Sequence, residues 1–220
     1  MIYDICTDNY SAFQIFEKNK LKPRAYFIPF QDRKSSETVS LCDERYKSNL
    51  VKVLNGKWDF KYYPKFSDMP KRFDTSIVDF DEVNVPSMWQ YTGYEKPYYI
   101  NQNYPFGRKP PKIPTDDPVG LYKTIRNGKW TPLTVDNIYN SVGVYRKKIE
   151  ISDIEKIFII SFLGCSSCLE LYVNGSFHGY SEGSHNTAEF NITDKLGKGE
   201  NEIVVVVHLS LIHISEPTRP

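Results

Sequence analysis

Two groups of neighbouring acidic residues are the side chains of this sequence best suited to acid–base chemistry. Asp116 and Asp117 are adjacent, and Asp79 is followed by Asp81 and Glu82. Two carboxyl groups about 5 Å apart can cleave a glycosidic bond, one as the nucleophile and the other as the acid and base. Both groups lie beside prolines or in polar stretches, however, where acidic side chains usually solvate a turn or cap a helix. We therefore predict no catalytic residue in this chain.

Cysteines are the second candidates, because Cys165 and Cys168 form a CxxC pair, whereas Cys6 and Cys42 lie far from it. A zinc site would need a second such pair, or two histidines at ligand spacing, and the sequence has neither. The pair also lies where a strand pattern begins, and residues three apart on a strand point to opposite faces. We interpret the two as small buried residues and predict no metal site.

Amide side chains occur in the proline-rich segment 97–118, whose prolines cannot donate to a sheet and therefore indicate loops. Asn101 and Gln102 lie in it. An amide offers two donors and an acceptor to hydroxyl groups without adding charge. A loop asparagine can equally cap its own backbone, and the residues alone leave this alternative open. Trp89, Tyr91 and Tyr98 could stack on a ligand, but an aromatic residue in this setting is more often part of the core.

The composition restricts the partners of the chain. Its 220 residues include 28 basic and 27 acidic side chains, a net charge of +1, and 40% are hydrophobic. This balance provides no electrostatic surface for nucleic acid or an anionic membrane. The first residues do not resemble a secretory leader, and no apolar stretch approaches the roughly 20 residues of a membrane span. We expect a soluble cytoplasmic protein that binds a neutral polar ligand.

Short strand patterns must position these residues. The ranges that alternate or are continuously apolar are 57–63, 143–151, 157–162, 168–173, 177–180, 189–192 and 202–207. Asn174 and Gly175 predict a two-residue hairpin turn. Residues 68–73 could form one short helix. Many short strands without a long amphipathic helix predict an all-β fold, a jelly-roll β-sandwich.

The ends of the chain differ from its middle. Residues 1–49 are polar, weakly periodic and broken by prolines, which predicts an extended amino-terminal arm before a domain over 50–208. Residues 209–220 begin with an apolar run that ends without a turn, and they resemble translated sequencing-adapter DNA. We expect 209–220 to be a non-native tail and the domain to be incomplete. The alternative is a genuine short tail.

Several short sequence motifs follow one another in a fixed order along the chain. They include Asn55-Gly-Lys-Trp-Asp-Phe60, Val85-Pro-Ser-Met-Trp-Gln90, Pro97-Tyr-Tyr-Ile-Asn-Gln-Asn-Tyr-Pro105, Pro114-Thr-Asp-Asp-Pro-Val-Gly120, Val173-Asn-Gly175 and Gly199-Glu-Asn201. Together they resemble the amino-terminal, sugar-binding domain of family 2 β-galactosidases, from about Leu54 to His208. The set is specific because so many strings keep their order.

This resemblance implies a galactose-binding-domain-like jelly roll. In the complete enzyme, it implies retaining hydrolysis of terminal β-D-galactosides by carboxylates of a downstream barrel. The fragment alone would then be inactive. Asn101 would hydrogen-bond the galactose, and Gln102 would lie in the same subsite. No cofactor is expected in the fragment, whereas magnesium and sodium are expected for the complete enzyme, which is also expected to be a homo-oligomer.

Departures from the family pattern lie at the end of the chain. A closing strand is expected after His208, and its absence would leave a sheet edge unpaired.

Two alternative functions stay open. One is a free-standing carbohydrate-binding module, and the other is a fragment of a family 2 β-glucuronidase or β-mannosidase.

Overall fold

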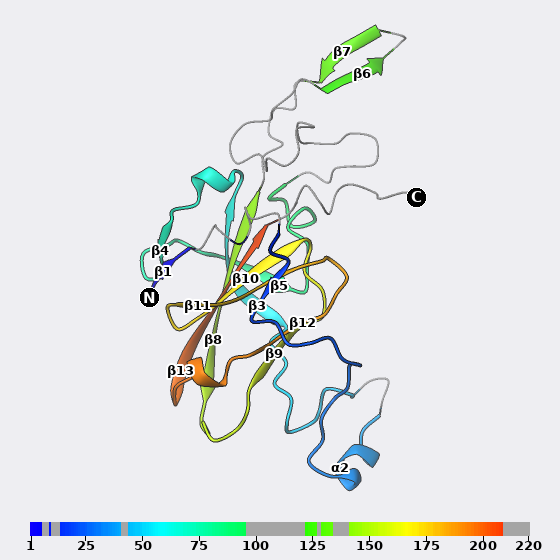
Figure 1. Ribbon diagram of the computed structural model, residues 1–220, viewed down its shortest axis with the longest axis vertical. Helices are drawn as coiled ribbons and strands as arrows, with labels where there is room; N and C mark the ends of the chain where they lie inside the picture. Colours follow the sequence, from blue (N-terminus) through cyan, green and yellow to red (C-terminus); the bar gives the residue numbers. More distant parts are fainter. Residues whose placement is uncertain are drawn as a thin grey trace.

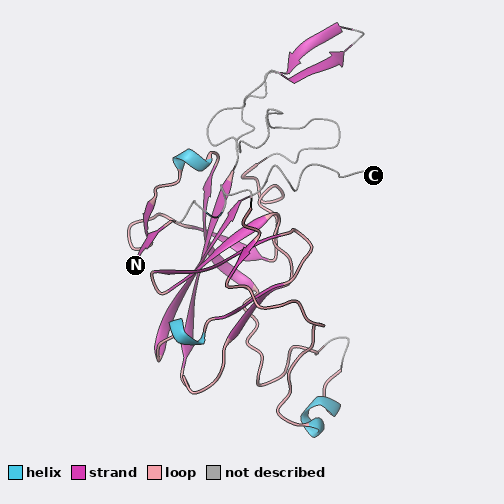
Figure 2. Ribbon diagram, in the orientation of Figure 1, coloured by secondary structure: helices cyan, strands magenta, loops and turns pink. Residues whose placement is uncertain are grey.

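The fold is nearly all β. The computed structural model describes residues 1–5, 9, 14–40, 44–95, 122–126, 129–133 and 141–208. Within these ranges the regular structure is strand, apart from single helical turns (Figure 2). None of the helices in these ranges is long and apolar enough to cross a membrane. The prediction of an all-β class is confirmed.

The elements are short, as expected for a sandwich. The strands are β1 Ile2–Asp4, β2 Glu17–Lys18, β3 Gly56–Tyr63, β4 Arg72–Asp74, β5 Asp81–Val85, β6 Tyr122–Arg126, β7 Lys129–Leu133, β8 Val142–Ile151, β9 Ile159–Phe162, β10 Cys168–Val173, β11 Ser176–Glu182, β12 Ala188–Asn191 and β13 Gly199–His208. The helical turns are α2 Arg33–Glu37, η1 Phe66–Asp68 and η2 Thr193–Lys195.

One antiparallel sheet organises the molecule. Its seven strands follow the order β2-β11-β10-β13-β8-β3-β5, and β8, β10 and β13 cross its centre (Figure 1). β13 pairs with β8 along its whole length, from Gly199 opposite Ile151 to His208 opposite Val142. β9 pairs with β12, β1 with β4, and β6 with β7, each as a separate two-stranded sheet.

Both faces of the central sheet are covered. On one face, β9 and β12 contribute Ile160 and Phe190 to an apolar core with side chains such as Leu171 and Val205 of the large sheet. On the other face, residues of β1 and β4 pack against alternate positions of β8 and β13. Because β13 is covered on both sides, every residue from Asn201 to His208 is buried. The packed sheets form the expected jelly-roll β-sandwich.

The predicted hairpin turn is confirmed. Asn174 and Gly175 join β10 to β11 with φ angles of 48° and 85°, and positive φ at both central residues is typical of a type I′ turn. The Asn174 amide Nδ2 donates to Asn201 Oδ1 at 2.7 Å, and its Oδ1 accepts from the Glu202 backbone N–H at 2.8 Å. The turn is therefore attached to the central strand.

The predicted helix over residues 68–73 is wrong. A single 3₁₀ turn, η1, ends at Asp68, and Met69 is extended at φ −77° and ψ 124°. Pro70 explains the ending, because the residue before a proline is disfavoured in the helical region. β4 follows, and its pairing with β1 could not be read from local sequence. The strand patterns also missed β5, β6 and β7.

The first residues of the expected arm lie inside the fold. Tyr3 is fully buried, and its hydroxyl donates to Glu202 Oε1 at 2.7 Å. The amino group of Met1 donates to Thr75 Oγ1 at 2.9 Å. Farther along, β2 extends the large sheet by pairing with β11. The boundaries at residues 49 and 208 stay predictions, and the tail 209–220 lies outside the described residues.

We predict that Gly143→Ala destabilises the sandwich. A Cβ at this position of β8 would lie 2.5 Å from Trp89 Cζ3 and 2.8 Å from Phe60 Cε2. Both rings belong to the core, so overpacking should lower the free energy of unfolding by about 1–3 kcal/mol. Urea unfolding of the 220-residue chain measures this. Gly197→Ala is the control, because the nearest atom to its Cβ would be 3.9 Å away. Equal midpoints for both variants would contradict the packing described.

Candidate functional site

The predicted sugar-binding residues lie between two chain segments that meet at one end of the sandwich. Asn101 and Gln102 themselves lie outside the described residues, as do Asp116, Asp117 and most of the segment 97–118. Glu95 is the last described residue before this stretch, and Ser141, which follows the hairpin of β6 and β7, leads into β8. Glu95 and Ser141 are therefore described residues on either side of the segment, and we call their contact the Glu95 anchor.

The Glu95 carboxylate forms this anchor. Its Oε2 accepts a hydrogen bond from the indole Nε1 of Trp89 at 2.9 Å and one from Ser141 Oγ at 3.1 Å. Burial raises the pKa of the Glu95 carboxyl, while the hydrogen bonds from Trp89, Ser141 and Tyr62 act in the opposite direction. Trp89 and Ser141, on either side of the intervening segment, are thus joined by one half-buried acidic side chain.

Aromatic rings form the floor under Glu95. Phe60 lies 4.9 Å from Tyr94, 4.6 Å from Tyr145 and 6.1 Å from Trp89, measured between ring centroids. Trp89 is only 4% exposed, so it is a core residue and presents no free face to a ligand. Tyr91, by contrast, is 79% exposed. The rings fix the indole N–H that Glu95 accepts.

The acidic group at residues 79–82 is engaged in the sheet. Asp81 Oδ2 accepts from the Tyr94 hydroxyl at 3.0 Å, whereas Glu82 forms an ion pair with Lys57 at 2.7 Å. The two acids are adjacent on β5, not in a polar loop as expected, and adjacent strand residues point to opposite faces. Their carboxylates therefore do not face a common substrate position.

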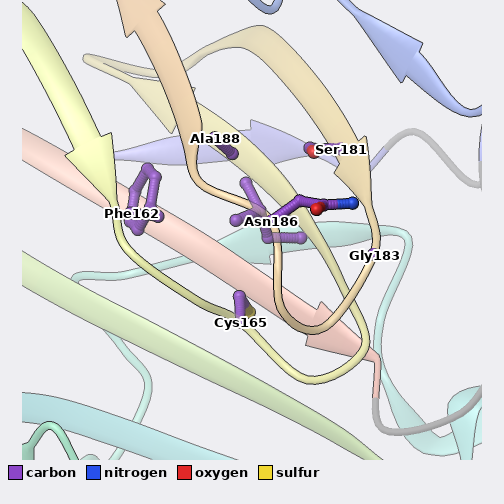
Figure 3. A pocket seen from close by; sticks show the side chains of 7 residues that line it. Phe162, Cys165, Ser181, Gly183, Asn186 and Ala188 are labelled. Carbon is purple, nitrogen blue, oxygen red and sulfur yellow. The ribbon is translucent and has the colours of Figure 1, made fainter. Parts of the chain in front are cut away.

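The CxxC pair lies beside a small hollow between the sheets. Figure 3 shows Phe162, Cys165 and Asn186 around it. The hollow has no room for a water molecule, so it is a packing feature. Burial raises the pKa of the Cys165 thiol to about 12 and that of Cys168 well above its usual value, so both stay protonated. Both thiols are free, and no group of metal-ligating side chains occurs among the described residues.

Two further ionisable residues are buried where β13 ends. Glu170 Oε2 accepts from the Tyr172 hydroxyl at 2.7 Å, and Glu170 Oε1 lies 4.0 Å from His208 Nε2. That distance is too long for a hydrogen bond. Burial raises the pKa of Glu170 to about 8 and lowers that of His208 to about 3. At neutral pH both groups are therefore uncharged, rather than an ion pair.

Comparison with known proteins identifies the family. Residues 51–215 match the model described as glycosyl hydrolases family 2, sugar binding domain. The chain belongs to this family. The match reaches past residue 208, the boundary that the sequence suggested.

Relatives of this family 2 chain are known from several bacteria. A β-galactosidase of Actinobacillus pleuropneumoniae is 34% identical over 86% of this chain and 16% of its own length. One of Leuconostoc mesenteroides is 36% identical over 77% of this chain and 15% of its own length. Among solved structures, a β-glucuronidase from Ruminococcus gnavus aligns at a TM-score of 0.45 and 14% identity, covering 71% of this chain and 21% of that one. The chain thus spans about one sixth of the curated relatives it matches.

Sequence reasoning missed Glu95 as an anchor of the family 2 site. It lies between the strings 85–90 and 97–105, which carried the resemblance, but a single acid there resembles a loop carboxylate. Its contact with Ser141 spans 46 positions, and no local pattern records such a contact.

We predict that Glu95→Ala lowers the stability of the family 2 domain by about 1–2 kcal/mol, because the Trp89 indole and the Ser141 hydroxyl would lose a partly buried acceptor. Urea unfolding followed by tryptophan fluorescence measures the change. The control is Glu82→Ala, which removes an exposed ion pair and should cause no measurable loss. Equal losses in the two variants would show that Glu95 is no anchor.

We also predict that Glu170 makes stability depend on pH. Its pKa of about 8 in the folded chain exceeds the ordinary 4.5, so stability is full below pH 4.5 and is lost as the pH rises through 8. The lowered pKa of His208 has the opposite slope, but only between about pH 3 and 6.5. Above pH 6.5 the Glu170 slope should therefore appear alone, on the order of 2 kcal/mol up to pH 8.

The measurement is urea unfolding at several pH values between 6.5 and 8.5. Glu170→Gln should remove the slope, whereas Glu200→Gln, at an exposed residue paired with Lys148, should keep it. A slope unchanged in Glu170→Gln would assign the titration to another group.

Proposed function

We propose that this chain is the amino-terminal sugar-binding part of a β-galactosidase that hydrolyses terminal β-D-galactosides with retention. The observation that supports this most is the similarity to proteins named β-galactosidase, at 34% and 36% identity over most of the chain. The match to a model of a sugar-binding domain supports a role in which this part of the enzyme binds the sugar and another part cleaves the glycosidic bond.

In this proposal Asn101 hydrogen-bonds the galactose and Gln102 lines the same subsite. An amide suits a position beside catalytic carboxylates, because it donates and accepts without shifting their charge. The contacts of Glu95 with Trp89 and Ser141 support the proposal, since they hold together the ends of the segment that carries Asn101. A binding loop with fixed ends loses less conformational freedom when the sugar binds.

The catalytic carboxylates of the proposed enzyme lie outside this chain, so the chain alone should cleave no glycoside. We propose further that the complete enzyme binds magnesium and sodium, is a homo-oligomer and is cytoplasmic. The near-neutral balance of charges fits an uncharged sugar as the ligand.

The proposal is tested by titrating the 220-residue chain with methyl β-D-galactopyranoside and following backbone amide signals by NMR. We expect saturable shifts that Asn101→Ala weakens about tenfold, because one hydrogen-bonding side chain is removed. Asn84→Ala, at an exposed asparagine of β5, is the matched control and should bind as the unchanged chain does. Wild-type binding by Asn101→Ala would contradict the proposed site. Tighter binding of the corresponding β-glucuronide or β-mannoside would favour those activities.

A further inference from the structure

A second groove lies away from the Glu95 anchor, towards the end of the sheet where β13 begins. It is formed beside the start of β11, the end of β12 and the turn η2, and its volume is about 660 Å³. Its lining residues are Asn19, Phe177, His178, Asn191, Thr193, Asp194 and Lys195. This volume lies within the range of small-molecule sites, but the groove is open to solvent rather than enclosed.

The groove contains a buried imidazole with nitrogens available to a ligand. His178 is only 7% exposed, and its ring packs against Phe190 with a centroid distance of 6.4 Å. Within the described part of the chain, no hydrogen bond is made to either ring nitrogen. His178 is not among the described residues with fully buried side-chain atoms that lack a hydrogen bond, so its ring nitrogens reach the solvent of the groove, where a ligand hydroxyl can replace water.

The groove is otherwise built from rigidly held polar groups. Asn191 Oδ1 accepts from Thr193 Oγ1 at 2.6 Å, and Thr193 Oγ1 accepts from the Phe158 backbone N–H at 2.8 Å. Asn19 Nδ2 donates to the backbone carbonyl of His178 at 2.6 Å. These bonds leave Asn19 Oδ1 and Asn191 Nδ2 for a ligand, because no other hydrogen bond to them occurs within the described residues.

Charge and aromatic surface narrow the chemistry of the ligand. Lys195 Nζ lies 3.7 Å from Asp194 Oδ2, so the two charges offset each other. Phe177 is half-buried, with its ring edge-on to Tyr172 and the Lys18 ammonium over it at 5.6 Å from the ring centroid, so only part of the ring supplies apolar surface beside the polar groups. Amides, an imidazole, a carboxylate and an ammonium around an apolar ring suit a neutral ligand with many hydroxyl groups better than an anion.

We propose that this groove is a second carbohydrate-binding site, separate from the site of Asn101. The saccharide hydroxyls bond to His178, Asn19 and Asp194, while an apolar face of the sugar ring packs on Phe177. The proposal is independent of the proposed activity, since it requires neither Asn101 nor a catalytic carboxylate.

The test is an NMR titration of the isotope-labelled 220-residue chain with lactose. Saturable shifts should appear at the backbone amides of the groove and at the His178 ring nitrogens, with a Kd on the order of 1 mM. Asp194→Asn and Phe177→Leu should each weaken this binding about tenfold. The control is Asp153→Asn, at an aspartate 3.5 Å from Lys156 on another surface, and it should bind lactose unchanged.

Each alternative outcome is distinct. Groove shifts that persist in Asn101→Ala support a separate site, whereas shifts that disappear in Asn101→Ala overturn it and leave the proposed function intact. Absence of saturable groove shifts, or equal shifts in all variants, also overturns it. Saturable binding of inorganic phosphate in place of lactose would overturn the assignment to a neutral saccharide. If a variant does not fold, the proposal is still tested by the unsubstituted chain, because lactose must shift its His178 ring signals.

Discussion

Burial of β13 on both faces is the constraint on which the sandwich depends. This strand lies between β10 and β8 and pairs with both along most of its length. Its alternate side chains enter two different cores, one closed by β9 and β12 and the other by β1 and β4. The run Ile203 to Val207 satisfies this demand with apolar, β-branched side chains, which suit a strand that has no solvent face.

Polar groups on the same strand show what such burial requires. Glu202 is 5% exposed and accepts from the hydroxyls of Tyr3 and Thr75 at 2.7 and 2.8 Å. Arg146 approaches its other oxygen at 3.9 Å. Glu170, on the neighbouring strand, has one hydroxyl donor and no such arginine. Burial raises the pKa of Glu170. Glu202 belongs to a polar network that attaches the amino-terminal strand.

Local patterns in the sequence predict the parts of the fold that local forces decide. The hairpin at Asn174 and Gly175 follows from residues that accept positive φ, and the alternation at residues 57–63 follows from a strand with one face in the core. β1 and β5 are different, because their pairing with β4 and β3 is decided by tertiary contacts. In β5, Val83 is flanked by Glu82 and Asn84, so the sequence of this strand resembles a polar loop. The family resemblance supplied Asn101, but the Glu95 anchor needed coordinates.

The contrast between long-range contacts and local turns also distinguishes the two regions that we propose for binding. At the Glu95 end, one carboxylate joins Trp89 to Ser141 by two hydrogen bonds, and its contact with Ser141 spans 46 positions of the chain. At the groove, the polar walls belong to short turns that are already hydrogen-bonded to the sheet, as when Asn174 Nδ2 donates to the Lys195 carbonyl at 2.8 Å. A rigid wall requires little ordering when a ligand arrives, so its affinity depends on how well hydroxyl groups replace the water at His178. The walls of the groove are thus attached to the sheet itself, because Asn174 joins the turn η2 to the central strand β13.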